Sequence, residues 1–166
     1  NTPLTLIVVF CAFGFLNFMG VRLLPASASL MAQNAAWCIV ALSVYHASFV
    51  AEALRSGVNT VPQGQAEAAR AIGLDFGQSL SQVVLPQAFR GSIVPLGNAL
   101  IALTKNTTVA VVMGVAEMAA MLAKVTEDDP GLLNQAFVAS AIAFVLLTLP
   151  TGLLVGHLGK KLAVKR

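Results

Sequence analysis

The feature that most constrains the fold is a series of apolar stretches that are almost free of charge and about as long as a bilayer is thick. Residues 4–19 contain no ionisable side chain, and further apolar stretches cover 35–54, 86–114 and 135–158. A helix rises about 1.5 Å per residue and about 20 residues cross the hydrocarbon core, so the first stretch is short but close to spanning length. Because lipid offers no hydrogen bonds to an open backbone, we expect an all-α, polytopic membrane helix bundle with four spans.

Composition supports a membrane protein and argues against a nucleic-acid partner. Of the 166 residues, 57% are hydrophobic and only 10% are charged, whereas a soluble domain carries about a quarter charged residues. The net charge is +3, but the basic residues form no continuous stripe. They gather instead behind the last apolar stretch, at Lys160, Lys161, Lys165 and Arg166. This pattern is typical of a cytoplasmic flank under the positive-inside rule.

A cytoplasmic C-terminus assigns a side of the membrane to every other polar segment. Four alternating spans place residues 65–86 inside and the acidic turn at 127–129 outside. The same alternation leaves Arg22 and Lys124 outside, a departure that the positive-inside rule tolerates. We therefore predict a multi-pass protein with its C-terminus in the cytoplasm.

The cytoplasmic segment 65–86 has the sequence of two short helices joined at a glycine. Residues 65–72 favour a helix that Gly73 ends by taking the left-handed conformation. Asp75 and Gln78 have the spacing of a capping box that opens a second helix. Four apolar residues then fall at helical spacing on one face, namely Phe76, Leu80, Val83 and Val84. Such a pair of helices suits either a protruding knob that docks on a partner or an interfacial pair lying on the lipid surface.

A second polar segment, residues 105–108, interrupts the third apolar stretch. Its sequence is Lys-Asn-Thr-Thr, and a lysine inside a membrane span is costly enough to face a cavity, a partner or a pathway as a rule. We expect local unwinding here, so that backbone groups and side chains meet a polar solute. The alternative is that Lys105 snorkels to the interface or pairs with a carboxylate such as Glu117 or Glu52.

Several kinds of chemistry have no support in the sequence. No Walker A pattern occurs, so we expect no ATP site in this chain and no bound cofactor of its own. His, Cys and carboxylate residues show no metal-ligand spacing, so we expect no metal. His46, alone on an apolar helix, is interpreted as a hydrogen-bonded packing residue, and Cys11 and Cys38 as packing residues.

The cytoplasmic segment resembles the EAA loop of importer-type ABC transporter permeases. In that loop EAA, three residues, a glycine, nine residues, an aliphatic residue, one residue and Leu-Pro recur in order. The matching anchors here are Glu67, Ala68, Ala69, Gly73, Val83, Leu85 and Pro86. Seven anchors in register between two apolar stretches make a specific signal, and they favour docking over an interfacial helix pair.

The resemblance extends to the polar amino acid uptake branch of these permeases and covers essentially the whole chain. The branch's run before the loop is matched by Phe49, Glu52, Arg55 and Gly57, its Gly-Gln by Gly64 and Gln65, and its Gln-Ala after Leu-Pro by Gln87 and Ala88. Its Lys-Asp/Asn-Thr/Ser-Ser motif is matched by Lys105, Asn106, Thr107 and Thr108, and its Gly-x-x-Glu-Leu by Gly114, Glu117 and Met118. Thr108 and Met118 replace a serine and a leucine, which keeps the hydroxyl and the apolar packing.

This resemblance implies a single transmembrane permease domain over residues 1–166. Family members typically have five spans, so one N-terminal helix would be missing here, followed by the 65–86 coupling loop and the 87–166 spans with the basic tail. The coupling residues would be Glu67, Ala68, Ala69, Gly73, Leu85 and Pro86, with Glu67 capping or hydrogen-bonding the coupling helix. The translocation path or substrate site would include Lys105, Asn106, Thr107, Thr108 and Glu117.

The resemblance also implies partners and a mechanism. Such subunits sit in the plasma membrane of a prokaryote and pair with a second permease, identical or homologous. They bind an ATP-binding cassette ATPase dimer, which holds the ATP, and an extracytoplasmic amino-acid-binding protein. Transport would proceed by alternating access, and cationic Lys105 beside neutral Asn106 makes glutamate the first substrate to consider. The alternative is an ATP-independent secondary transporter or channel, because broken helices and intramembrane polar residues mark those proteins as well.

Overall fold

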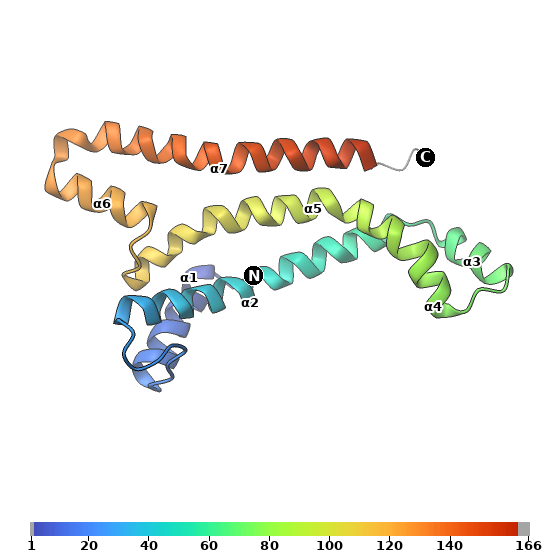
Figure 1. Ribbon diagram of the computed structural model, residues 1–166, viewed down its shortest axis with the longest axis horizontal. Helices are drawn as coiled ribbons and strands as arrows, with labels where there is room; N and C mark the ends of the chain where they lie inside the picture. Colours follow the sequence, from blue (N-terminus) through green and yellow to red (C-terminus); the bar gives the residue numbers. More distant parts are fainter. Residues whose placement is uncertain (1, 163–166) are drawn as a thin grey trace. The chain divides into compact units, whose positions relative to one another are not determined.

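The computed structural model describes residues 2–162, and within them all regular structure is helical (Figure 1). In chain order the elements are α1 (Leu4–Val9), the π-helical η1 (Phe10–Phe18), α2 (Leu30–Asn59), α3 (Gln63–Ala71), α4 (Phe76–Gln78), the π-helical η2 (Ser79–Val84), α5 (Leu85–Asn106), the 3-10 helix η3 (Thr107–Met113), α6 (Met118–Asp128), the 3-10 turn η4 (Pro130–Leu132) and α7 (Leu133–Leu162). The all-α prediction is confirmed.

Three helical stretches of the described chain are long and apolar enough to cross a membrane. They are Leu30–Asn59, Phe76–Met113 and Pro130–Leu162, and a shorter apolar helix covers Leu4–Phe18. These are the four predicted spans, with the first again the shortest. Lys160 and Lys161 of the predicted basic tail lie in the last turn of α7, whereas Lys165 and Arg166 lie outside the described residues.

The chain divides into two compact units, each made of two separate segments. One unit comprises Asn1–Ala47 and Ala102–Thr148, and the other comprises Ser48–Ile101 and Leu149–Arg166. The predicted single domain over residues 1–166 stays a prediction, and each unit is described separately here.

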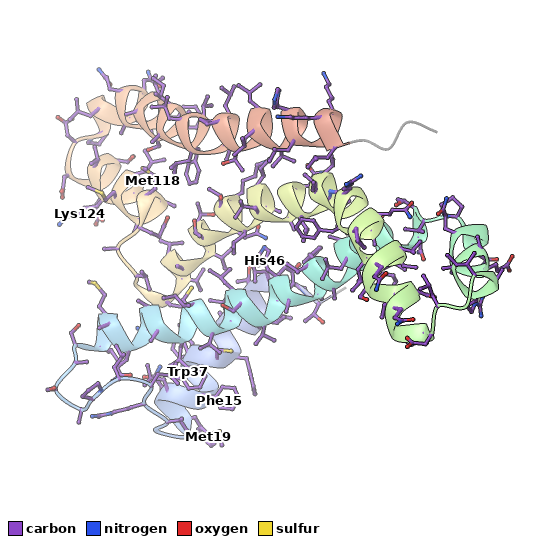
Figure 2. The ribbon with its side chains drawn as sticks, turned by 45° about the vertical axis from the view of Figure 1, so that its right-hand side comes forward. Phe15, Met19, Trp37, His46, Met118 and Lys124 are labelled. Atoms are coloured by element: carbon purple, nitrogen blue, oxygen red, sulfur yellow. The ribbon has the colours of Figure 1, made fainter. Side chains whose placement is uncertain are left out.

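The first unit has a continuous apolar core built from four helical elements, α1, η1, α2 and η3. Its buried members are Val8, Cys11, Ala12, Leu16, Trp37, Cys38, Ala41, Leu42, Ala110 and Met113. The ring of Trp37 stacks on Phe15 with centroids 5.1 Å apart (Figure 2), and its Nε1 donates to the Val21 carbonyl at 3.0 Å. Both cysteines therefore lie in the core as predicted, and burial of this apolar surface holds α1, η1 and η3 on α2.

In the second unit, small residues allow α2 and α5 to approach closely. A Cβ added to Gly57 would overlap the Ser92 hydroxyl and the Ala88 carbonyl, and one added to Gly91 would lie 3.3 Å from the Gly57 Cα. Ser92 itself is buried and donates to the Ala88 carbonyl at 2.9 Å, which satisfies its hydroxyl within its own helix. Gly57, which the sequence analysis matched only by resemblance, is therefore a packing position.

Candidate functional site

The predicted coupling segment turns at Gly73 through a Schellman motif. Gly73 has φ +89°, and its N–H donates to the Arg70 carbonyl at 3.0 Å while the Leu74 N–H donates to the Ala69 carbonyl at 3.1 Å. These two bonds satisfy carbonyls that the end of α3 would otherwise leave unpaired. Glycine takes a positive φ without the clash that a Cβ produces. The prediction of a left-handed glycine corner is confirmed, although α3 covers Gln63–Ala71 and so begins two residues earlier than expected.

The predicted capping box after this corner is also present. Asp75 Oδ1 accepts from the Gln78 N–H at 2.8 Å, and Gln78 Oε1 accepts from the Asp75 N–H at 3.0 Å. The reciprocal bonds fix the direction in which the chain leaves the corner, because they hold both ends of the first turn of α4.

Leu85 and Pro86 lie inside a continuous helical stretch instead of at the start of a new span. The predicted third span begins at Pro86, but the helix runs without a break from Phe76 to Met113. Proline lacks an N–H and its ring crowds the preceding turn. The wider π-helix η2 (Ser79–Val84) ends two residues before Pro86, and the Leu85 N–H at its end donates to the Leu80 carbonyl five residues back. This wider turn accommodates Pro86, and the Gln87 side chain donates to the Val83 carbonyl at 2.9 Å.

The corner exposes two large apolar side chains outside the apolar stretches. Ile72 is 79% exposed and Phe76 is 80% exposed, whereas Ala69 of the EAA triplet is buried, with α3 packed on η2. Phe76 therefore does not share the half-buried face of Leu80, Val83 and Val84 as predicted. The reason is that the change from α4 to the π-helical η2 breaks the 3.6-residue period on which that prediction rested.

Glu67 does not have the capping role that the resemblance implied. The residue at the start of α3 is Pro62, and no side chain caps that end. Glu67 lies in the middle of α3 with its side chain exposed. Its carboxylate, together with exposed Ala68, is part of the open surface of the coupling segment.

The intramembrane segment 105–108 changes the helix type instead of unwinding the chain. α5 ends at Asn106 and continues directly as the 3-10 helix η3. Thr107 Oγ1 donates to the Thr104 carbonyl at 2.7 Å, and Thr108 Oγ1 donates to the Lys105 carbonyl at 2.9 Å. The two hydroxyls supply bonds to carbonyls at the junction, so the expected loss of helical structure does not occur.

Neither carboxylate considered as a partner for Lys105 is paired with it. Glu117 lies at the N-terminal cap of α6, where its two carboxylate oxygens accept from the Ala119 and Ala120 N–H groups at 2.8 and 2.9 Å. Glu52 lies 3.8 Å from Arg55, and this is the one ion pair among residues 2–162. The Lys105 side chain is exposed. In this structure Glu117 caps α6 and makes no ion pair with Lys105. Its part in a translocation path stays a prediction.

Asn106 is joined to a residue that the sequence analysis did not connect with it. His46 on α2 is buried, with Nδ1 3.0 Å from the Leu42 carbonyl and Nε2 3.2 Å from Asn106 Nδ2. The prediction that His46 is a hydrogen-bonded packing residue is confirmed. No signal in a single sequence links positions 46 and 106, because sixty residues separate them.

The two predicted regions differ in the groups that they expose. Within residues 2–162 no group of three or more His, Cys, Asp or Glu side chains is placed to hold a metal ion. The coupling segment presents an apolar corner and a carboxylate. The segment 105–108 presents an ammonium group, an amide and two hydroxyls.

Comparisons with known proteins point in one direction. The model of the family described as "binding-protein-dependent transport system inner membrane component" matches residues 2–164. The glutamate transport system permease protein GluC of Corynebacterium glutamicum is 48% identical, over 100% of this chain and 74% of its own length. The arginine transport system permease protein ArtQ of Bacillus subtilis is 30% identical, over 91% of this chain and 65% of its own length.

One solved structure has a similar fold. The crystal structure of an amino acid ABC transporter with histidines superposes with a TM-score of 0.75 at 24% sequence identity, covering 96% of this chain and 70% of that one. At this identity the likeness concerns the fold, and it agrees with the helical membrane architecture described above.

Proposed function

The chain belongs to the family of binding-protein-dependent transport system inner membrane components, and from that premise we propose how it works as a permease subunit of an amino acid importer. It would form the translocation path in the membrane and take its force from a separate ATPase. The observation that carries this proposal is the corner at Gly73, where a Schellman motif and a capping box hold an exposed apolar surface at the start of the Phe76–Met113 stretch.

The proposed docking surface is the corner between α3 and α4. Exposed Ile72 and Phe76 would insert into a groove of the ATPase, because large apolar side chains in water gain free energy by burial in a partner. The coupling set would be Glu67, Ala68, Ala69, Gly73, Leu85 and Pro86. Within it, buried Ala69 lets α3 pack on η2, exposed Glu67 and Ala68 face the partner, and the Leu85–Pro86 step anchors the following helix.

The proposed substrate site lies at the junction of α5 and η3. Lys105, Asn106, Thr107 and Thr108 would line the path, with Glu117 at the following cap. The ammonium group of Lys105 suits a carboxylate, which every amino acid carries. Because the relative with 48% identity is named for glutamate and another for arginine, glutamate is our first choice within the class of polar amino acids.

The proposed assembly has four kinds of component. This permease would pair with a second permease, bind an ATP-binding cassette ATPase dimer at its corner and receive substrate from an extracytoplasmic binding protein. The ATP would be bound by the ATPase, and this chain would have no ATP site of its own. The corner and the C-terminus would lie in the cytoplasm, since the basic residues follow the last span.

Alternating access is the mechanism that fits these parts. Closure of the ATPase dimer on ATP would move the docked corners, and the spans would move with them. The path would then open to one side of the membrane at a time, as in transporters whose binding sites lie near broken or irregular helices.

Capture of the tagged permease from its native membrane tests the proposal directly. We expect an ATPase, a second permease and an amino-acid-binding protein to be captured with it. A double variant, Ile72→Asp with Phe76→Asp, should lose the ATPase and keep the second permease, because charge in the apolar corner opposes docking only there. Gly64→Ala is the matched control, since a Cβ at Gly64 meets no atom within 4 Å and alanine favours the helix.

An ATP-independent carrier is the alternative, and family membership does not favour it. The capture experiment distinguishes the two. A permease that is recovered without any ATPase, in detergent that preserves other membrane complexes, and that still transports amino acids would refute the proposal.

A further inference from the structure

His46 is a buried imidazole with a hydrogen-bonding group near each ring nitrogen. It lies on α2 (Figure 2) and is 5% exposed. The centroid of its ring is 5.3 Å from that of Tyr45. Nδ1 lies 3.0 Å from the Leu42 carbonyl of the same helix, and Nε2 lies 3.2 Å from Asn106 Nδ2. Both contacts lie in the same compact unit.

The contact with Leu42 fixes the tautomer of His46. A carbonyl oxygen only accepts hydrogen bonds, so Nδ1 must carry a hydrogen to make a favourable contact at 3.0 Å. A neutral imidazole has one donor and one acceptor, which leaves Nε2 with a lone pair. The reverse tautomer would set the Nδ1 lone pair against the carbonyl oxygen.

The tautomer in turn fixes the amide of Asn106. Nε2 as an acceptor must face the NH₂ group of the amide, which agrees with the 3.2 Å contact to Nδ2. The carbonyl oxygen Oδ1 is then turned away from His46, and it has no hydrogen-bond partner among the described residues. Asn106 is half-buried, and Oδ1 is not among the fully buried side-chain atoms without a partner, so part of its surface is open.

The backbone beneath Asn106 is held in place as well. Asn34 Nδ2 donates to the Met113 carbonyl at 2.9 Å, so η3 is bonded to α2 at its far end as well as at Asn106. Twelve residues of α-helix between Asn34 and His46 span roughly 18 Å, and the seven-residue η3 spans about 14 Å, which lets both bonds form at once. A 3-10 helix of this length is uncommon and often marks a functional segment.

The groups beside Asn106 suit the two ends of an amino acid. The hydroxyl hydrogens of Thr107 and Thr108 are donated to backbone carbonyls, so these hydroxyls can only accept from a ligand, as Oδ1 does, whereas the Lys105 ammonium group only donates. A zwitterionic amino acid needs a donor for its carboxylate and an acceptor for its ammonium group. Lys105 would supply the first and Asn106 Oδ1 the second.

We propose that His46 is a positioning residue, whose neutral imidazole holds the Asn106 amide so that Oδ1 accepts an N–H of the transported amino acid. This inference rests on the proposed function, since it places Asn106 in the substrate site. It adds a residue that does not touch the substrate and that acts through Asn106.

Nitrogen-15 NMR of the histidine-labelled transporter in lipid nanodiscs tests the geometry without any transport measurement. The chain has two histidines, and a His157→Gln variant identifies the signals of His46. We expect a protonated Nδ1 and an unprotonated Nε2. In Asn106→Asp, whose carboxylate only accepts, Nε2 should gain a hydrogen. A protonated Nε2 with a bare Nδ1 in the unsubstituted protein overturns the proposal.

Uptake of L-glutamate by proteoliposomes tests the consequence. His46→Phe keeps a ring and removes the acceptor, and the KM should rise roughly two- to tenfold, as expected for one neutral hydrogen bond. His46→Gln places an amide oxygen near the position of Nε2, and its KM should stay within about twofold of that of the unsubstituted transporter on the same scale.

The outcomes separate this inference from the proposed function. A KM that is unchanged in His46→Phe, or equally raised in His46→Phe and His46→Gln, overturns the role of His46 as the partner that orients Asn106. Failure of the unsubstituted complex to take up any amino acid refutes the proposed function instead, and the tautomer measurement still reports on the His46–Asn106 contact.

Discussion

Replacing Gly73 by valine isolates the contribution of one backbone conformation to energy coupling. Gly73 has φ +89°, and a Cβ built on it meets no heavy atom within 4 Å. The added Cβ therefore meets no residue other than the two chain neighbours, and the substitution removes no side-chain contact. What remains is the strain of an L-residue in the left-handed region, about 1–2 kcal/mol and more for a β-branched side chain.

A strain of about 1–2 kcal/mol is enough to change the conformation of a local turn, but it is small beside the free energy of unfolding of a whole protein. If another ending of α3 is otherwise equal in free energy, 1–2 kcal/mol lowers the population of the Schellman corner by roughly five- to thirtyfold. The spans do not depend on this turn, so the permease should still insert and pair. The exposed Ile72 and Phe76 would lose their fixed spacing, because they flank Gly73 on both sides.

The assay is the ratio of amino acid taken up to ATP hydrolysed in proteoliposomes that contain the whole transporter. We expect Gly73→Val to lower this ratio severalfold or to abolish the stimulation of ATPase activity by the loaded binding protein. Gly73→Asn should behave nearly as the unsubstituted protein, since asparagine tolerates positive φ. Unchanged uptake and unchanged stimulated ATPase activity in Gly73→Val would refute the reasoning that this corner transmits force.

Three further predictions concern packing, the path and the α6 cap. Gly57→Ala should lower the midpoint of thermal unfolding, because the added Cβ overpacks against Ser92 at a cost of about 1–3 kcal/mol. Gly156→Ala is the control, since a Cβ there meets no atom within 4 Å. Equal midpoints of the two variants in fluorescence-monitored melts would contradict this prediction. Lys105→Ala should lower L-glutamate uptake per assembled complex by roughly tenfold or more, since a hydrogen bond to a charged group contributes about 1.5–3 kcal/mol; poor assembly with normal uptake per complex contradicts this. Glu117→Ser keeps a capping oxygen and removes the charge, so uptake per complex should fall while the melting point holds, and equal uptake would restrict Glu117 to capping.

Local chemistry at the corner was predictable because each feature depends on a few adjacent residues. A glycine after a polar helical run, followed by Asp75 and Gln78 at capping-box spacing, specifies a turn without reference to the rest of the chain. The structure confirms both elements to the residue. The spans were predictable for a similar reason, since their length and lack of charge are properties of the segment alone.

Contacts between distant segments were not predictable from one sequence. Nothing in the run around His46 indicates that Asn106 is its partner, and Asn34 gives no sign that it bonds to the Met113 carbonyl. Gly57 was noted only as a motif position of the family, and its close contact with Ser92 and Ala88 was not predicted. Such pairings depend on which helix faces pack together, and that is settled by the summed burial of many side chains.

Two of the remaining differences from prediction are changes of the 3.6-residue helical period. At η2 the helix widens just before Pro86, and Phe76 falls out of line with Leu80 and Val83. At η3 it tightens after Asn106, where two threonine hydroxyls bond to carbonyls three residues back. A change of period rotates every later side chain about the helix axis. It therefore changes which side chains lie on a given face, while the helix itself continues. Both changes lie on the one helical stretch Phe76–Met113; the first is next to the proposed docking corner and the second is at the proposed substrate segment. If the proposed function is right, substitutions that restore a plain α-helix there should impair transport more than they impair folding.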